Sequence, residues 1–220
     1  MKNFLKTTIG IIILAILILI VRGKNEEAAE AEDKRQEAIE KEEEEQVAIA
    51  KKKKDEMAAK HAEDKAEAEK RGFIEAKILY TFDGDTIQVS IDGKEETLRF
   101  IGVDTPESVN PDKEKNTPEG KVASEFTKGY MKEGHKIYLE FDEVKVDKYE
   151  RTLAYVWLSP KVDTDSYDDF CKYNYGAILL QRTYCRAEYI PPNGRYYEWY
   201  KKLEDENQEN VREKYEKEAN

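Results

Sequence analysis

The chain has 220 residues, of which 39% are charged, and a formal net charge of −11 at pH 7. Most of the acidic excess falls on residues 73–220, so the overall field opposes polyanions, and any contact with nucleic acid must come from locally placed Arg and Lys. The two cysteines and two histidines form no cluster with metal-ligand spacing, which argues against a zinc site and against histidine-based catalysis.

Residues 1–24 form an apolar segment, and residues 4–21 contain a single charged residue, Lys6. A membrane-spanning helix needs about twenty residues, and one lysine near its end can reach the interface. An uncleaved anchor is favoured over a cleaved signal peptide, because the small residues typical of a cleavage site come late, at 28–31.

The positive charges on the two sides of this segment are nearly balanced, so they do not fix its orientation. An N-terminal anchor followed by a large C-terminal domain favours an extracytoplasmic domain. We therefore expect a single-pass protein of the cell membrane, or a secreted protein if the segment is cleaved.

Residues 25–72 are nearly all Ala and charged residues, with many Glu–Lys pairs four residues apart, and Ala, Glu and Lys are good helix formers. The few larger apolar residues follow no sustained heptad. The composition favours a solvated single helix or a disordered spacer over a coiled coil. Either would act as a stalk.

From Phe73 onward the pattern changes to alternating apolar and polar residues, with Asp92-Gly93 as a hairpin signal. Helical spacing returns at residues 118–132, after Thr117 as a cap. Two more strands and two more helices follow, at 135–144, 151–158, 169–182 and 195–210. This order predicts an α+β domain at 73–210, with a five-stranded barrel and three helices, followed by a charged tail at 211–220. We also expect the domain to be monomeric.

Two acidic turns follow strands, DGDT at 83–86 and DTPE at 104–107. Either turn alone is a common way to satisfy backbone donors. In a three-stranded meander, however, Asp85 and Asp104 meet at the same end of the sheet, where two carboxylates repel each other unless a cation lies between them. Ca²⁺ suits such a site because it accepts loose geometry and main-chain carbonyls.

Arg99 lies inside the strand that precedes the second turn, and Arg151 begins the fifth strand. One interpretation of Arg99 is an ion pair with Asp85 or Glu107. The other is a phosphate clamp, because the guanidinium fork matches phosphate oxygens in a bidentate manner. Arg151 would supply a second such fork.

The stretches DGDT, LRFIGVDTPES and DKYERTLAYVW resemble, in order and spacing, the staphylococcal nuclease (thermonuclease) family over roughly residues 73–205. The resemblance implies an OB-fold β-barrel with three helices and a Ca²⁺-dependent endonuclease that hydrolyses phosphodiester bonds of DNA and RNA. Single-stranded nucleic acid is the expected substrate.

Matching positions carry the family's roles onto six residues of this sequence. The resemblance implies that Asp85, Asp104 and the main-chain carbonyl of Thr105 bind Ca²⁺. It also implies that Glu107 orients or deprotonates the attacking water, while Arg99 and Arg151 hold the phosphate.

The sequence departs from the family at two places. Glu150 stands where the family usually has Gly, so this turn is either strained or differently shaped. Glu188 and Ile190 stand where nucleotide-stacking aromatic residues are expected, although Tyr189 lies one residue away. The preference between DNA and RNA is therefore not carried over.

Two hypotheses follow, a membrane-tethered Ca²⁺-dependent nuclease and a catalytically silent OB-fold module that binds nucleic acid or protein. Silent domains commonly lose the carboxylates or arginines of the site, and this chain retains all five side chains. The sequence therefore favours the enzyme. Cys171 and Cys185 are expected as free thiols, because a helix separates them by more than a disulfide can span.

Overall fold

The structure is a computed structural model that describes the backbone of residues 2–218 and the side chains of residues 22, 23, 30 and 32–208. It contains two compact units, Met1–Lys60 and His61–Asn220. The helices are α1 (Lys2–Arg71), η1 (Lys113–Lys115), α2 (Pro118–Tyr130), α3 (Tyr167–Tyr173), α4 (Tyr175–Gln181) and α5 (Tyr197–Glu218). The strands are β1 (Ile74–Thr81), β2 (Thr86–Ile91), β3 (Lys94–Phe100), β4 (Val103–Asp104), β5 (Lys136–Glu140), β6 (Thr152–Trp157) and β7 (Arg186–Ala187).

The predicted stalk is helical, which confirms the helical interpretation of its composition. Side chains 32–60 are exposed along the whole stretch, and Lys34 pairs with Glu30 at 2.6 Å, four residues away. The predicted anchor at 4–21 lies outside the residues whose side chains the structure describes and stays a prediction. Among the residues that are described, no helix is both long and apolar enough for a membrane span.

The last turns of α1 belong to the second compact unit. Ala68 is buried in its core, His61 lies 3.1 Å from the Glu75 carboxylate, and Lys161 pairs with Glu63 at 2.8 Å. The helix therefore ends as part of the folded domain. The domain limits at residues 24, 72 and 210 stay predictions.

Five strands close into a barrel in the order β1-β2-β3-β6-β5, with β3 and β6 parallel and the other pairs antiparallel. The predicted five-stranded barrel is thus confirmed. Asp92 and Gly93 both have positive φ, 50° and 82°, as a tight two-residue hairpin loop requires. This turn fixes the register of β2 on β3, in which Thr86 faces Arg99.

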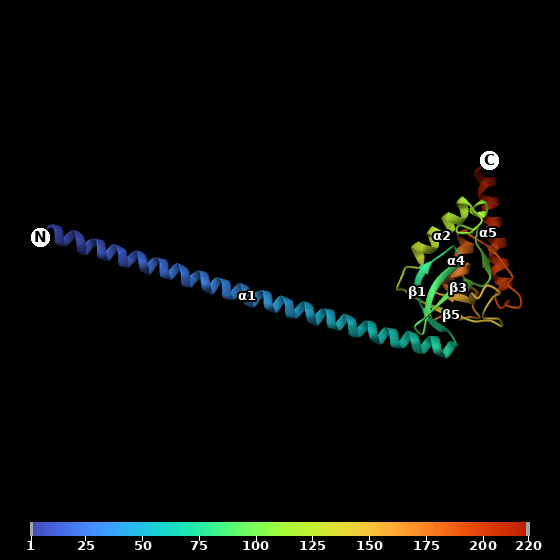
Figure 1. The fold of residues 1–220 in the computed structure, drawn as a ribbon, viewed down its shortest axis with the longest axis horizontal. Coiled ribbons are helices and arrows are strands. Elements are labelled where there is room, and N and C mark those ends of the chain that lie inside the picture. The colour runs from blue at the N-terminus through green and yellow to red at the C-terminus, as the bar shows by residue number, and fades with distance from the viewer. Residues whose placement is uncertain (1, 219–220) are drawn as a thin grey trace. The chain divides into compact units, whose positions relative to one another are not determined.

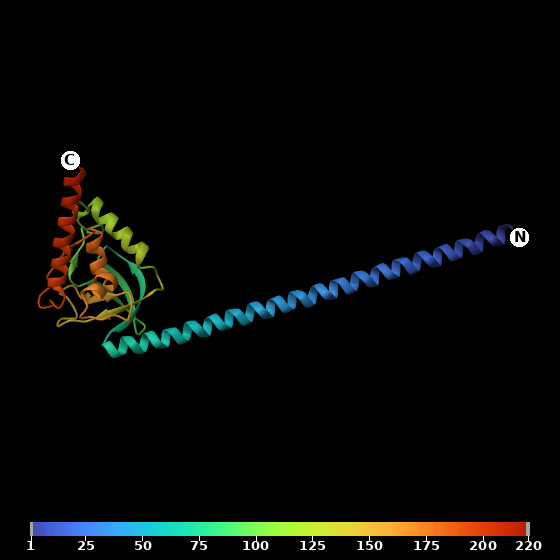
Figure 2. The same ribbon diagram turned by 180° about the vertical axis from the view of Figure 1, so that it is seen from behind.

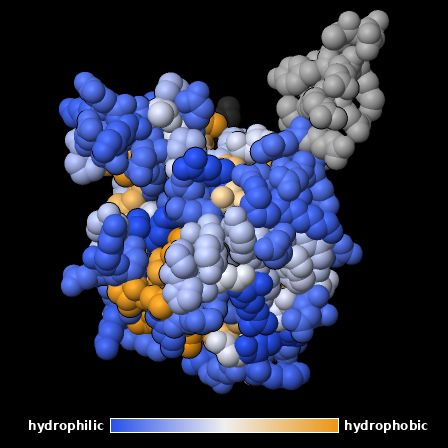
Figure 3. All heavy atoms as spheres, turned by 90° about the vertical axis from the view of Figure 1, so that its right-hand side faces the viewer, coloured by the Kyte–Doolittle hydropathy of each residue, from blue (hydrophilic) through white to orange (hydrophobic). Residues whose placement is uncertain are grey.

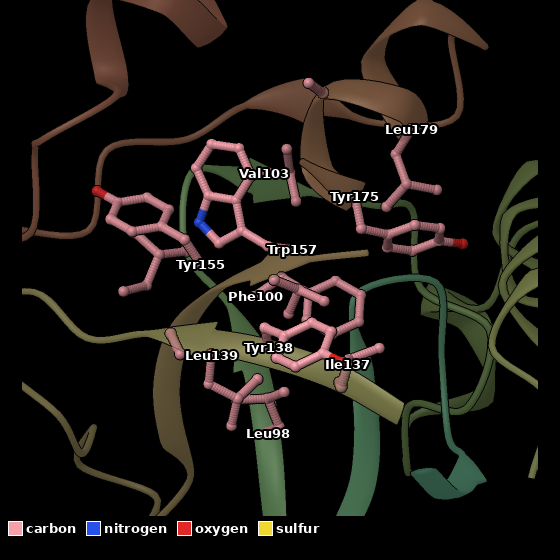
Figure 4. Packing of buried hydrophobic residues seen from close by; sticks show 14 of the residues in the cluster. Leu98, Phe100, Val103, Ile137, Tyr138, Leu139, Tyr155, Trp157, Tyr175 and Leu179 are labelled. Carbon is pink, nitrogen blue, oxygen red and sulfur yellow. The ribbon is translucent and has the colours of Figure 1, made fainter. Parts of the chain in front are cut away.

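Large aromatic residues pack among aliphatic side chains in the core (Figure 4). Trp157 is fully buried and stacks on Phe73 with ring centroids 6.0 Å apart, while Phe100 meets Tyr175 edge to face at 5.6 Å. Such pairs add about 0.5–1.5 kcal/mol each beyond the area that they bury. The Phe100–Tyr175 pair joins the barrel to α4. In the ribbon views, α2 and α5 lie outside the barrel strands (Figures 1 and 2).

The helix predicted at 169–182 is wrong as a single element, because it breaks at Asn174. The backbone of Asn174 is extended, and its side chain accepts a hydrogen bond from Ala177 N at 3.2 Å, capping α4. Its main chain also bridges to Trp157 on β6. After α1, the described residues therefore form four α-helices rather than three, and a two-stranded sheet of β4 and β7 was not predicted.

The surface drawn in Figure 3 is mostly hydrophilic, with only small groups of hydrophobic side chains, as the charged composition requires.

Cys171 and Cys185 are both free thiols and partly buried.

Candidate active site

A cavity of about 810 Å³ is lined by the six residues that the sequence singles out, Asp85, Arg99, Asp104, Thr105, Glu107 and Arg151. They come from four segments: the start of β2, the end of β3, the β4 turn and the start of β6. Exposed rings of Tyr149 and Tyr189 line the same cavity. The structure therefore brings together all the residues that we predicted to share one site.

Asp85 connects the two acidic turns. Its Oδ2 accepts hydrogen bonds from the main-chain N of Thr105 at 2.8 Å and from Thr105 Oγ1 at 2.9 Å, and its Oδ1 accepts one from Thr86 Oγ1 at 2.9 Å. The carboxylate is almost fully buried. Buried charges need such donors, so these bonds fix where Asp85 points.

Asp83 holds the second turn from the other side. Its carboxylate accepts hydrogen bonds from Ser108 Oγ at 2.7 Å and from Ser108 N at 3.2 Å. Ser108 directly follows Glu107, so Asp83 fixes the loop that carries this residue.

The Arg99 side chain is 7% exposed, and its two terminal nitrogens contact two different sets of partners. Its Nη1 donates to two main-chain carbonyls, those of Phe100 at 2.8 Å and Val103 at 2.6 Å. Its Nη2 lies 3.5 Å from Asp85, 3.4 Å from Asp104 and 2.8 Å from Glu188. The ion-pair interpretation of Arg99 is correct for Asp85, and the other two partners were not foreseen.

Asp104 lies between two guanidinium groups. Its Oδ1 faces Arg99, and its Oδ2 accepts from Arg186 Nη2 at 2.8 Å and Nε at 3.1 Å. Arg186 reaches this position because β7 pairs with β4, with Asp104 opposite Arg186. Sequence reasoning missed Arg186, because two-residue strands carry no detectable periodicity.

Arg151 is oriented by Asp147. Both Nε and Nη2 of Arg151 bind Asp147 Oδ2, at 2.8 and 2.7 Å, and the main-chain N of Arg151 binds Oδ1 at 2.9 Å. Burial raises the pKa of Asp147, but the hydrogen bonds from Arg151 and Tyr149 N outweigh it and hold that pKa below its ordinary value. Asp147 was missed, although its spacing four residues before Arg151 was an available signal.

Glu188 lies beside this group at 40% side-chain exposure. Burial raises the pKa of Glu188, and although Arg99 lowers it, the nearby charges of Asp104 and Asp85 add to the rise. Three carboxylates therefore compete for one guanidinium nitrogen.

The Glu107 side chain is exposed to the cavity, and its backbone is held by the start of α2. The Glu107 carbonyl accepts a hydrogen bond from Thr117 N at 2.9 Å, next to the predicted Thr117 cap. Gly120, one turn into α2, packs directly on the Glu107 carbonyl, and any Cβ at this position would overlap it. Gly120 therefore sets the position of Glu107 through backbone contact.

Replacing Gly120 with Ala is expected to lower kcat by on the order of 10²-fold with little change in KM, because it displaces the Glu107 backbone. Gly129→Ala is the matched control, since this glycine lies in the same helix with open space around it. The control should keep full activity and gain up to about 1 kcal/mol in unfolding free energy from helix propensity. Steady-state kinetics and urea unfolding measure both effects, and equal kcat values for the two variants would contradict the positioning role.

Glu150 has φ of 64°, so the family's Gly position does require a left-handed backbone in this chain. The strained alternative for this turn is correct. The turn is closed by hydrogen bonds from Glu150 N to Asp147 O at 3.1 Å and from Asp147 N to Arg151 O at 3.0 Å.

Glu150→Gly should unfold with a free energy about 1 kcal/mol higher than that of Glu150→Ala, because only glycine relieves the left-handed strain. Both variants remove the same carboxylate, so their difference in urea unfolding isolates the backbone effect. Equal stability of the two variants would show that the turn is unstrained.

The donors around Asp85 and Asp104 suit a hard cation. Both carboxylates lie within 3.5 Å of the same Arg99 nitrogen, and Thr105, which directly follows Asp104, lines the same cavity and has a main-chain carbonyl to offer. With Glu188, three acidic groups face two guanidinium groups, so the cluster keeps an excess negative charge. Among the residues that the structure describes, no three His, Cys, Asp or Glu side chains are grouped so that they could hold a metal ion. A cation held by two carboxylates and a main-chain carbonyl would take its remaining oxygen ligands from water.

At one end of the closed barrel, Asp85 and Asp104 lie beside the guanidinium groups of Arg99 and Arg186. The chain belongs to the family of staphylococcal nuclease homologues, whose model matches residues 97–213, more than half of its length. This match includes Arg99, Asp104, Glu107 and Arg151 and begins after Asp85.

Three relatives illustrate the similarity. The thermonuclease of Staphylococcus hyicus is 42% identical over 125 residues, covering 56% of this chain and 64% of the relative. The thermonuclease of Staphylococcus intermedius is 42% identical over 117 residues, covering 52% and 60%. Endonuclease YncB of Bacillus subtilis (strain 168) is 36% identical over 126 residues, covering 56% and 53%. The chain spans less than two thirds of the length of each.

Proposed function

We propose that the protein is a Ca²⁺-dependent endonuclease that hydrolyses phosphodiester bonds of DNA and RNA, with single-stranded substrates preferred. The observation that carries this proposal is the meeting of Asp85, Asp104, Glu107, Arg99 and Arg151 in one open cavity. The printed names of the relatives, two thermonucleases and an endonuclease, support the same chemistry.

Three side chains have distinct roles in the proposed hydrolysis. The Glu107 carboxylate, exposed to the cavity, accepts a proton from the attacking water. Nη2 of Arg99 and the fork of Arg151 donate to phosphate oxygens, where negative charge grows in the transition state. Because Asp147 and the carbonyls of Phe100 and Val103 fix both arginines beforehand, the donors need little reorganisation during the reaction.

Asp85, Asp104 and the Thr105 carbonyl would hold the cation. Bound Ca²⁺ would supply positive charge that polarises the phosphate and stabilises the developing anion. The buried hydrogen bonds on Asp85 keep this carboxylate in place.

The test is degradation of a fluorescent single-stranded DNA by the purified full chain. We expect cleavage in millimolar Ca²⁺ and none after addition of a chelator in excess. Cleavage that persists in chelator would overturn the metal assignment, and the absence of cleavage at any Ca²⁺ concentration would favour a silent binding module.

We place the nuclease on the extracytoplasmic side of the cell membrane, anchored through residues 4–21, with residues 25–72 as the stalk and a monomeric head. The apolar composition of residues 4–21 supports the anchor. Protease added to intact cells should remove the C-terminal domain, and complete protection of the domain would refute this orientation.

A further inference from the structure

Glu188 is held next to Arg99 by the backbone. It directly follows β7, and its main-chain N donates to Gly102 O at 3.0 Å, on the turn between β3 and β4. Gly102 has φ of 93°, and a Cβ there would overlap the Tyr200 ring. The conformation of this turn therefore requires glycine at position 102. The same turn carries Arg99 and Asp104 at its two ends, which fixes Glu188 against the site.

The Glu188 carboxylate occupies the part of Arg99 that a phosphate would need. Nη1 of Arg99 is already used by two main-chain carbonyls, so Nη2 is the nitrogen that can turn to a ligand. Glu188 Oε2 lies 2.8 Å from Nη2, closer than either Asp85 or Asp104. Because Arg99 is 7% exposed and Glu188 40% exposed, Glu188 is the member of the pair that faces solvent.

We propose that Glu188 sets the substrate affinity of this site by competing with the substrate phosphate for Arg99. This inference rests on the proposed function. The substrate must displace the Glu188 carboxylate before Arg99 can bind phosphate, so affinity is lower than an unpaired arginine would give. Glu188 stands where the family resemblance leads one to expect a stacking aromatic residue, and the competition is therefore a property of this chain.

Displacement is feasible because the Glu188 side chain reaches solvent and has like-charged neighbours. Asp104 is also bound by Arg186, so it stays in place when Glu188 leaves. Once the substrate is bound, Glu188 no longer touches Arg99. The competition therefore raises KM and leaves kcat unchanged.

The test compares Glu188→Gln with the wild-type full chain. In the variant, the charge-assisted hydrogen bond between Arg99 and residue 188 loses its carboxylate charge and competes less well with phosphate. KM for single-stranded DNA in Ca²⁺ should therefore fall about tenfold, and kcat should stay within about twofold of the wild-type value. The dissociation constant of the same oligonucleotide in chelator, measured by fluorescence anisotropy at low salt, should fall by a similar factor. Glu143→Gln is the control, because it makes the same change in net charge at an exposed residue outside the cavity.

A double variant separates local competition from a general charge effect. In an Arg99→Ala background, Glu188→Gln should leave oligonucleotide binding unchanged, because the competed group is absent. Tightening that persists without Arg99, or that Glu143→Gln reproduces, would overturn the competition.

The two proposals fail in different ways. A wild-type chain that cleaves DNA while Glu188→Gln leaves KM unchanged would overturn the competition and leave the nuclease assignment intact. Tighter oligonucleotide binding by Glu188→Gln in a chain that never cleaves DNA would support the competition and overturn the nuclease assignment.

Discussion

Glu107→Gln is expected to lower kcat by on the order of 10²-fold or more, because the amide cannot accept a proton from the attacking water. The substitution keeps the size of the side chain, and the Glu107 backbone is held independently by Thr117 and Gly120. Substrate binding should therefore survive. Steady-state kinetics on single-stranded DNA should show the loss in kcat, with KM nearly unchanged.

The control for this variant is Glu119→Gln, an exposed acid in the first turn of α2, outside the cavity. It should keep wild-type kinetics. A Glu107→Gln variant with wild-type kcat would remove Glu107 from the mechanism.

Arg151→Ala is expected to lower kcat by on the order of 10²-fold, the usual effect of removing one preorganised transition-state donor. The structure supports this magnitude because Asp147 holds the guanidinium in place before the substrate arrives. Arg151→Lys should restore little activity, since an ammonium group keeps the charge but lacks the fork.

Arg182→Ala removes the same charge from an exposed residue at the end of α4 and serves as the control. It should leave kcat unchanged. If Arg151→Lys restored wild-type kcat, charge alone would suffice and the bidentate role would be wrong. If Arg151→Ala were itself fully active, Arg151 would be no part of the site.

Local signals in the sequence predicted much of this site. The Asp92-Gly93 turn fixes the register of β2 on β3, and this register places Asp85 and Asp104 at one end of the barrel. The Thr117 cap likewise marks the start of α2. These features depend on residues that are close together in the chain, so the sequence alone is enough to predict them.

The contacts of the residues following β7 could not be predicted in the same way. Glu188 and Arg99 are 89 residues apart, and they meet only because β7 pairs with β4. Arg186 reaches Asp104 through the same two-residue pairing. The break at Asn174 also depends on a tertiary contact, the bridge to Trp157, which the local sequence does not reveal.

Calorimetric titration of the full chain with Ca²⁺ tests most directly whether Asp85 and Asp104 share one cation. The account predicts one Ca²⁺ site in the wild type, affinity lowered about tenfold or more in both Asp85→Asn and Asp104→Asn, and no change in Asp165→Asn, whose side chain is 94% exposed. Circular dichroism establishes that each variant is folded. Wild-type Ca²⁺ affinity in folded Asp104→Asn or Asp85→Asn would contradict the account.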